Sequence, residues 1–310
     1  MSKKEEECDK TSTEIDTCYS FKDIVNNEGF YDSCIDGTYV IHLEGNEERI
    51  KNVNEQLEIY KPSKNIHILN NKGFKKCDKK LKEQTPRCDL IDCFIKIFKH
   101  AEDKNYGNIL ILEDDFVFNE KIKETTCIEE ITEFVNKRTI TGSNFIYLLG
   151  CIPYLQIPSI FHNHTRVIFS TGTHSSIYSK EFRRNVLCEE QDKITDWDLY
   201  TNINSPFTSR YIYKTPLCYQ LFYETDNYKS WDDSYNFKYI IMNIFKMLNM
   251  DNKPEPGFTF FYVLSRILYF LLIILFYYSV KTIIDVIILV SDYLFFNKFN
   301  FFFGFFINKF

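Results

Sequence analysis

Strand-like and helix-like segments alternate through the first third of the chain, and this order restricts the fold to the α/β class. TYVIHL (residues 38–43) is a short β-branched and aromatic run, and the EERIKNVNEQLEIY that follows has apolar side chains at helical spacing. NIHILN begins a second strand at Asn65, a second amphipathic helix opens near Pro86, and NILILEDD follows it. The order strand, helix, strand, helix, strand favours a mostly parallel sheet with right-handed crossovers.

The remaining patterns divide the chain into four parts. Ile128–Val135 and Lys180–Leu187 are predicted helices, while NFIYLLG, RVIFSTGTHSSIYS and RYIYKTPLCYQLFY contain further strands. We therefore expect an acidic, flexible arm over residues 1–36, a folded α/β domain over 37–248, a polar and proline-bearing linker over 249–257, and a membrane-associated tail over 258–310.

Composition and charge limit which classes of partner the chain can bind and which cellular compartment it can occupy. The hydrophobic content of 45% is enough for a real core, and the acids concentrate before Gly37, so no basic patch indicates a nucleic-acid partner. The N-terminus has no apolar signal segment, which predicts a body that faces the cytosol. The ten cysteines are scattered without paired spacing. We expect free thiols, with Cys93 in the core.

The tail is almost wholly apolar from Phe258 to Val280, which is long enough to cross a bilayer. Arg266 lies near its first end and can reach the headgroups. In the next segment Asp285, Ser291 and Asp292 lie on roughly one helical face, which indicates either an in-plane amphipathic helix or a second span. We expect one span followed by an interfacial helix; a buried helical subdomain is the alternative.

Three acids follow the third predicted strand directly. On a strand, Glu113 and Asp115 point to one face and Asp114 points to the other. Carboxylates held side by side repel each other unless a cation lies between them, and Mg²⁺ or Mn²⁺ prefers such oxygen ligands. Ligands of open α/β sheets bind at the carboxyl ends of the strands. The pattern therefore predicts a metal site, although an acidic, solvated turn would give the same sequence.

Several stretches together resemble glycosyltransferase family 25, which includes lipopolysaccharide-type and procollagen galactosyltransferases. They are YVIHL followed by Arg49, ILEDDFVF, STGTHSSIYS and ITDWDLY, and they cover roughly Gly37 to Tyr223. The resemblance implies a GT-A-type, Rossmann-like nucleotide-sugar-binding fold. It also implies a metal-dependent, inverting transfer of a hexose from a nucleotide sugar, expected to be a UDP-sugar, to an acceptor hydroxyl.

The resemblance also assigns roles to the acids and to one arginine. Glu113, Asp114 and Asp115 match the family's DxD-like metal and nucleotide-sugar site, with Glu113 and Asp115 as ligands of Mn²⁺ or Mg²⁺ and Asp114 on the nucleotide side. Arg49 matches the arginine that meets the nucleotide after the first strand. A plain charge on a helix surface is the other reading of Arg49.

Further residues match the sugar and acceptor side. Thr173 and His174, in the stretch TGTH, match a loop near the sugar, and a buried histidine without catalytic duty is the other reading of His174. Asp196 is the candidate general base and Asp198 the substitute, and a helix N-cap is the other reading of Asp196. The acceptor is a glycan, a lipid-linked molecule or a protein.

One departure from the family leaves a second hypothesis open. The family's Cys-x-x-Ser-His signature is replaced by DLIDCFIK in the helix before the acids. The chain could therefore be a catalytically inactive glycosyltransferase-like membrane adaptor. In either case we expect a membrane-associated protein whose folded domain faces the cytosol.

Overall fold

The computed structural model describes residues 17–204, 208–221, 243–250 and 253–307. Within them two compact units are distinguished, one ending at Ser265 and one beginning at Arg266. The strands of the first unit are β1 (Tyr19–Val25), β2 (Gly37–Leu43), β3 (Asn65–Asn71), β4 (Ile109–Glu113), β5 (Phe116–Phe118), β6 (Phe145–Ile157), β7 (His164–Tyr178), β8 (Ser209–Tyr213) and β9 (Cys218–Gln220). Its helices are α1 (Glu47–Ile59), α2 (Pro86–Asp103), α3 (Thr125–Ile140), α4 (Lys180–Leu187) and the short α5 (Trp197–Leu199).

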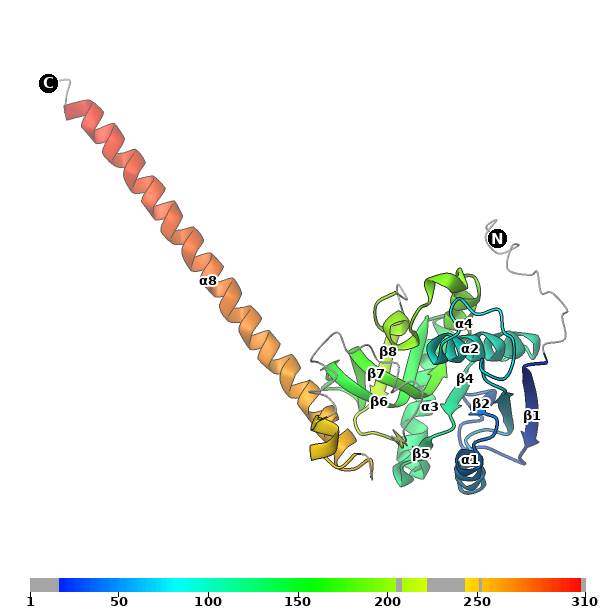
Figure 1. Ribbon diagram of the computed structural model, residues 1–310. Coiled ribbons are helices and arrows are strands. Elements are labelled where there is room, and N and C mark those ends of the chain that lie inside the picture. The colour runs from blue at the N-terminus through cyan, green and yellow to red at the C-terminus, as the bar shows by residue number, and fades with distance from the viewer. Residues whose placement is uncertain (1–16, 205–207, 222–242, 251–252, 308–310) are drawn as a thin grey trace. The chain divides into compact units, whose positions relative to one another are not determined.

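The main sheet has seven strands in the order β1-β3-β2-β4-β7-β6-β8 (Figure 1). Its middle, β3-β2-β4, is parallel, as two strand-helix-strand units require. The expectation of a mostly parallel sheet is otherwise wrong, because β1 lies antiparallel to β3, and β7 lies antiparallel to both β4 and β6. The domain is therefore a mixed α/β sheet, and β5 pairs with β9 in a small separate ribbon.

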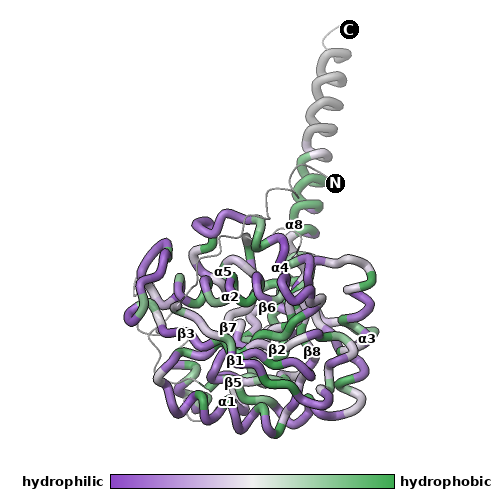
Figure 2. The backbone as a smooth tube through the Cα atoms, turned by 90° about the vertical axis from the view of Figure 1, so that its right-hand side faces the viewer, coloured by the Kyte–Doolittle hydropathy of each residue, from purple (hydrophilic) through white to green (hydrophobic). Residues whose placement is uncertain are grey.

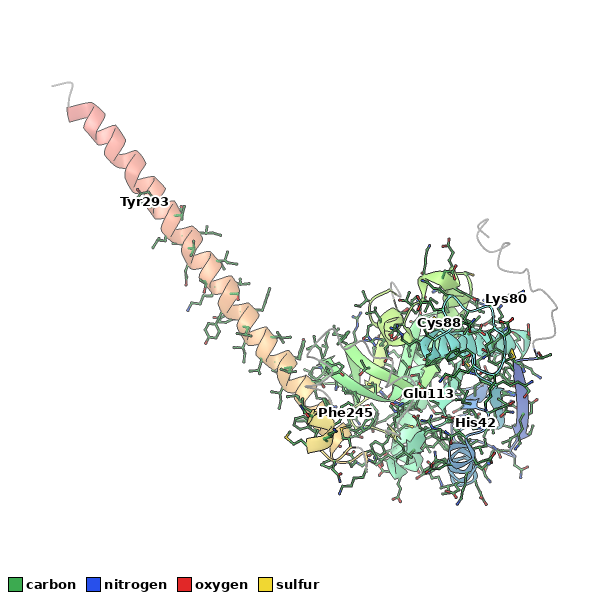
Figure 3. The ribbon with its side chains drawn as sticks, viewed as in Figure 1. His42, Lys80, Cys88, Glu113, Phe245 and Tyr293 are labelled. Atoms are coloured by element: carbon green, nitrogen blue, oxygen red, sulfur yellow. A yellow bond between two sulfur atoms is a disulfide. The ribbon has the colours of Figure 1, made fainter. Side chains whose placement is uncertain are left out.

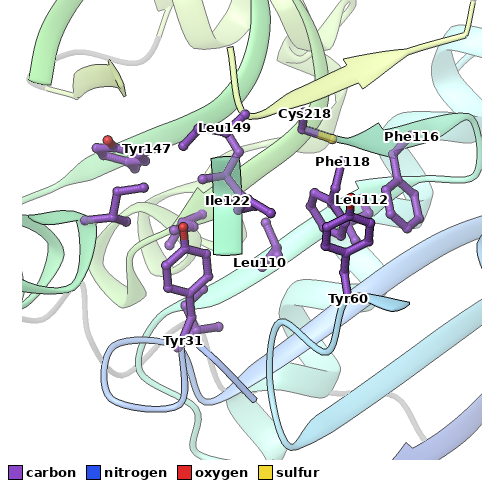
Figure 4. Close-up of a cluster of buried hydrophobic side chains, with 14 of the residues drawn as sticks. Tyr31, Tyr60, Leu110, Leu112, Phe116, Phe118, Ile122, Tyr147, Leu149 and Cys218 are labelled. Carbon is purple, nitrogen blue, oxygen red and sulfur yellow. The ribbon is translucent and has the colours of Figure 1, made fainter. Parts of the chain in front are cut away.

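Helices cover both faces of the sheet, so the central strands are buried on both sides. Side chains of α1 and α3 pack with Val40, Leu110 and Leu112 in one core, part of which Figure 4 shows. Side chains of α2 and α4 pack on the other face with Tyr39 and Ile41. Strands enclosed in this way carry apolar side chains at every position, which is why β4 reads as an unbroken apolar run.

Local sequence explains where the second helix begins. The Thr85 hydroxyl accepts a hydrogen bond from the Cys88 amide, and Pro86 occupies the first turn, where its missing N–H costs nothing. Cys93 lies in the core on this helix and is fully buried, as the sequence predicted.

Two expectations about the N-terminal region differ from the structure. Residues 1–16 lie outside the described part, but Tyr19–Val25 forms β1, so the acidic segment is not a flexible arm over its whole length. Cys18 and Cys77 form a disulfide, and Cys188 is also disulfide-bonded, so the expectation of only free thiols is wrong. The free cysteines among the described residues are all buried.

The C-terminal helix α8 (Gly257–Ile307) is continuous over 51 residues. Its stretch Gly257–Ser291 is long and apolar enough to cross a membrane, with a mean hydropathy of 2.2. The described backbone shows no break between the expected span and the expected interfacial helix, so that division is not observed. The first turns of α8, green in Figure 2, belong to the first unit, where Phe258, Phe261 and Tyr262 are buried.

Candidate functional site

The acidic triplet lies where the parallel strand β4 ends, at the carboxyl edge of the sheet's parallel centre. Glu113 is the last residue of β4 and is half-buried, whereas Asp114 and Asp115 in the following turn are only 5% and 2% exposed. A solvated turn would leave these side chains in water. The structure therefore excludes the solvated-turn reading for Asp114 and Asp115.

Asp114 points away from its two neighbours and is fully occupied by protein donors. Its carboxylate accepts the Leu43 amide at 3.2 Å and contacts His42 Nδ1 at 3.0 Å and an Arg49 nitrogen at 2.5 Å. Burial alone would raise the pKa of Asp114, but hydrogen bonding to His42 and the charge of Arg49 lower it below its ordinary value. Asp114 thus fastens β4 to the end of β2 and the start of α1. Figure 3 marks His42 and Glu113, from the neighbouring strands β2 and β4.

Glu113 and Asp115 are electrostatically close, although Asp115 lies in the turn after β4 and not on the strand. Burial raises the pKa of Glu113 well above its ordinary value, and the charges of Asp115 and Asp198 raise it further. Burial likewise raises the pKa of Asp115 to about 6, although Arg49, whose second nitrogen lies 3.6 Å away, opposes the shift. The Asp115 Oδ2 atom accepts a hydrogen bond from Gln220 at 3.2 Å, while its buried Oδ1 atom has no hydrogen-bond partner among the described residues.

Asp198 is the third carboxylate of this group, although it is distant from Glu113 and Asp115 in the sequence. Its Oδ2 atom accepts the Gly172 amide at 3.2 Å, and its buried Oδ1 atom has no partner in the part of the chain that is described. Burial raises the pKa of Asp198 to about 6, and the neighbouring charge of Asp196 adds to the shift. We call Glu113, Asp115 and Asp198 the carboxylate cluster.

Asp196 does a different job from Asp198. Its Oδ1 atom accepts the Leu199 amide at 2.8 Å and caps the short helix α5. Between the two acids, Trp197 is buried and stacks on Phe94 at 4.4 Å, which fixes the orientation of this turn. The N-cap reading of Asp196 therefore fits the geometry, and Asp198 is the acid that faces the carboxylate cluster.

The stretch TGTH lies in β7 beside the cluster. Gly172 has φ +82°, a conformation that favours glycine, and it turns its amide towards Asp198. Thr173 lowers the pKa of Asp198 and thus opposes part of the shift caused by burial. His174 is 1% exposed, and burial lowers its pKa to about 4, so its ring is neutral. The ring donates from Nε2 to the Cys218 carbonyl at 3.4 Å, which matches the reading of a buried histidine.

Two residues of the site carried no signal that sequence reasoning used. His42, near the end of β2, contacts Asp114, and its place in a short strand-like run gave no sign of this. Gln220 lies 105 positions from Asp115 and reaches it through the β5-β9 ribbon. No local pattern could have linked them, because the contact depends on how two distant strands pair.

The metal expectation was tested against the geometry of the described side chains. Among them no group of three or more His, Cys, Asp or Glu residues has the arrangement of a complete metal site. Of the two expected ligands, Asp115 nevertheless has a buried carboxylate oxygen without a partner among the described residues, which suits a cation, and Glu113 adds a half-buried carboxylate. Mg²⁺ is commonly held by one or two protein carboxylates, with the remaining ligands supplied by water and substrate phosphates.

The first turns of α8, residues 257–265, lie beside this site, and we call them the root of α8. The ring of Phe258 lies 5.9 Å from that of His174 and 5.3 Å from that of Tyr219. The Tyr219 hydroxyl donates to Glu255 at 2.8 Å, and its neighbour Gln220 holds Asp115. Phe258 at the start of α8 is thus linked to Asp115 through Tyr219 and its chain neighbour Gln220.

Comparison with known proteins adds only a broad likeness of fold. No protein-family model matches the chain, and no curated protein matches it. A197 from STIV covers 61% of this chain and 86% of its own, with 11% identity and a TM-score of 0.36. A glycosyltransferase involved in the glycosylation of the major capsid of PBCV-1 covers 62% of this chain and 95% of its own, with 13% identity and a TM-score of 0.35. No conclusion about the activity of this chain follows from likenesses at this level.

Proposed function

We propose that this chain is a glycosyltransferase with a GT-A-type domain that moves a hexose from a nucleotide sugar, expected to be a UDP-sugar, to an acceptor hydroxyl. The observation that carries the proposal is the carboxylate cluster at the carboxyl end of β4, with its raised pKa values and its unpartnered oxygens. Buried like charges of this kind are costly to a fold and are concentrated at functional sites. The family 25 resemblance of the surrounding motifs supplies the reaction class.

Glu113 and Asp115 are the residues that would hold Mn²⁺ or Mg²⁺ in this proposal. When bound, such an ion supplies the charge neutralisation that a departing nucleoside diphosphate needs. The positively charged guanidinium of Arg49, which is bound by Asp114, lies 3.6 Å from Asp115 and so adds a second positive charge beside the same acids. Asp114 is therefore a positioning residue here: it orients Arg49 and does not itself face the donor.

The proton of the acceptor hydroxyl needs a base, and Asp198 fits that role better than Asp196. Its pKa near 6 lies close to neutral pH, where a general base works most efficiently, and its Oδ1 atom is unpartnered among the described residues. The Gly172 amide orients the carboxylate. Inversion of the anomeric centre follows if the hydroxyl attacks from the face opposite the leaving diphosphate.

The acceptor is proposed to be membrane-borne, with a lipid-linked acceptor favoured over a soluble glycan or a protein. The support is the short path from His174 through Phe258 to α8, which holds the site next to the root of a candidate span. The side of the membrane is also a proposal, and it reverses the sequence expectation. Disulfides such as Cys18–Cys77 persist in oxidising compartments, so the catalytic domain is assigned to the non-cytosolic side.

The test is a panel of nucleotide sugars offered to the full chain in lipid nanodiscs, with Mn²⁺ and with a chelator. Release of UDP that requires the ion and is lost in Asp115→Asn supports the proposal. Ion-dependent binding of UDP without transfer to any acceptor, including lipid-linked ones, would favour the inactive adaptor. If UDP does not bind in the presence of Mn²⁺, the glycosyltransferase proposal fails, and the adaptor, which needs no nucleotide, remains.

A further inference from the structure

The turn between β6 and β7 exposes two neighbouring apolar side chains almost completely. Ile160 is 88% exposed and Phe161 is 90% exposed, more than any other large apolar side chain among the described residues. Single exposed apolar residues are common on protein surfaces and need no explanation. An adjacent exposed pair at the tip of a turn does need an explanation when it lies near a helix that could enter lipid, as α8 could.

The first link between this turn and α8 is a buried amide. Gln156, near the end of β6, is fully buried, and its side chain donates to the Ser265 hydroxyl at 2.7 Å and to the Tyr262 carbonyl at 3.3 Å. Ile160 follows Gln156 by four positions, and at the rise of an extended chain the two residues lie at most ~13 Å apart. The tip of the turn is therefore held near the point where α8 leaves the domain.

The second link is a row of aromatic rings. Phe169 on β7 is 38% exposed, and its ring lies 5.6 Å from that of Tyr154, which in turn lies 6.4 Å from that of Phe261. Each end of this row has an exposed apolar neighbour in the sequence: Ile168 next to Phe169, and Phe260 next to Phe261. We call the whole set the apolar seat; it consists of Ile160, Phe161, Ile168, Phe169, Phe260 and Val263.

We propose that the apolar seat is a second membrane-contact surface, which inserts Ile160 and Phe161 into the headgroup region of the bilayer that α8 enters. The occupant is lipid because two residues of the seat, Phe260 and Val263, belong to an apolar helix of membrane-spanning length. The exposed Arg166 beside it suits phosphate headgroups. The proposal rests on α8 entering a membrane and is independent of the transfer reaction.

A consequence concerns the catalytic site. One helix alone leaves a domain free to tilt on the membrane surface, whereas a second contact limits that tilt. The strand β7 that carries Ile168 and Phe169 also carries Thr173 and His174. The seat would therefore hold the carboxylate cluster at a defined height above the lipid.

The experiment places a fluorescent label on the tip of the turn in the full chain in nanodiscs. Ile160→Cys is labelled with a polarity-sensitive dye, and Ile140→Cys is the matched control, because Ile140 at the end of α3 is 86% exposed. The free cysteines among the described residues are buried, and labelled wild-type protein gives the background. Lipids that carry a quenching spin label near the headgroup are then added to the nanodisc.

The expected result is loss of fluorescence and a blue shift for the label at position 160, with neither change at position 140. Phe161→Cys should behave like Ile160→Cys, which guards against a failure of one variant. A label at position 160 that is unquenched overturns the proposal, whether the dye remains in water or is shielded by protein. Equal quenching at positions 140 and 160 also overturns it, because the effect would then not belong to the seat.

Discussion

Replacing Asp114 or Asp115 by asparagine should change the free energy of unfolding in opposite directions. Asp115 is buried beside Glu113, and its pKa is raised from 3.8 to about 6, which means that the folded protein disfavours its charge. Each pKa unit corresponds to about 1.4 kcal/mol, so the ionised carboxylate costs at most roughly 3 kcal/mol at neutral pH. Asp115→Asn at nearly constant volume should therefore stabilise the metal-free protein, by about 1–3 kcal/mol.

The matched control is Asp114→Asn, one residue away and equally buried. Here the charge is favourable, since the carboxylate is held by His42, Arg49 and a backbone amide. Removing it breaks the closer of the two ion pairs that Arg49 makes, with Asp115 remaining 3.6 Å away, and breaking such a pair costs up to about 3–5 kcal/mol. Asp114→Asn should therefore unfold at a lower temperature than the wild type.

Thermal and denaturant unfolding of the domain, measured with a chelator and then with Mn²⁺ and UDP, separates the two effects. Ligand binding stabilises the wild type by about 2.7 kcal/mol at a hundredfold excess over Kd, and Asp115→Asn should lose most of this gain. If Asp115→Asn is less stable than the wild type in chelator, the carboxylate is a structural anchor and the reasoning from its burial is wrong. An undiminished response to Mn²⁺ and UDP would remove it from the metal site.

Three further outcomes follow from the same structure. Asp198→Asn should retain UDP binding in a calorimeter but lower transfer by roughly 10²- to 10⁴-fold, the usual contribution of a positioned base, whereas Asp196→Asn keeps a good N-cap and should be nearly silent. Because the folded-state pKa of His174 is lowered to about 4 from 6.5, stability is complete above pH 6.5 and falls by up to roughly 3 kcal/mol as the pH drops towards 4; His174→Gln should flatten this part of the curve. Protein isolated under non-reducing conditions should resist alkylation at Cys18 and Cys77, and its reduction should lower the unfolding free energy by about 2–5 kcal/mol.

The elements that sequence predicted well are those whose signal is local. The β2-α1-β3-α2-β4 order follows from short apolar runs and helical spacing, and it was confirmed because tertiary packing supports the same choice. β1 was missed because it is an edge strand with a mostly exposed, charged sequence, YSFKDIV, and only its pairing with β3 identifies it. The antiparallel insertion of β7 between β4 and β6 was missed for a related reason: no local pattern encodes which distant strands pair.

The site shows the same division between local and distant information. The closeness of the three acids is local information, since they are consecutive residues, but β4 ends at Glu113, so the expected strand alternation does not extend to Asp114 and Asp115. The choice between Asp196 and Asp198 could not be made in the same way. Two acids around a tryptophan look equivalent in sequence, and only the packing of Trp197 decides which one caps a helix and which one faces the cluster.

The root of α8 shows why hydropathy alone misplaces the start of a membrane span. Phe258, Phe261 and Tyr262 are apolar enough to be counted as lipid-facing, yet each is buried in the domain, and Ser265 is fixed by the amide of Gln156. Lipid can therefore first surround the helix after Ser265, which moves Arg266 from the interior of the apolar run to its beginning. The remaining stretch, residues 266–291, still measures roughly 39 Å at 1.5 Å per residue and exceeds the thickness of a hydrocarbon core. One apolar segment thus has two parts with different surroundings. Its first turns pack in the domain, where Phe258 contacts His174, and the rest is free to enter the membrane.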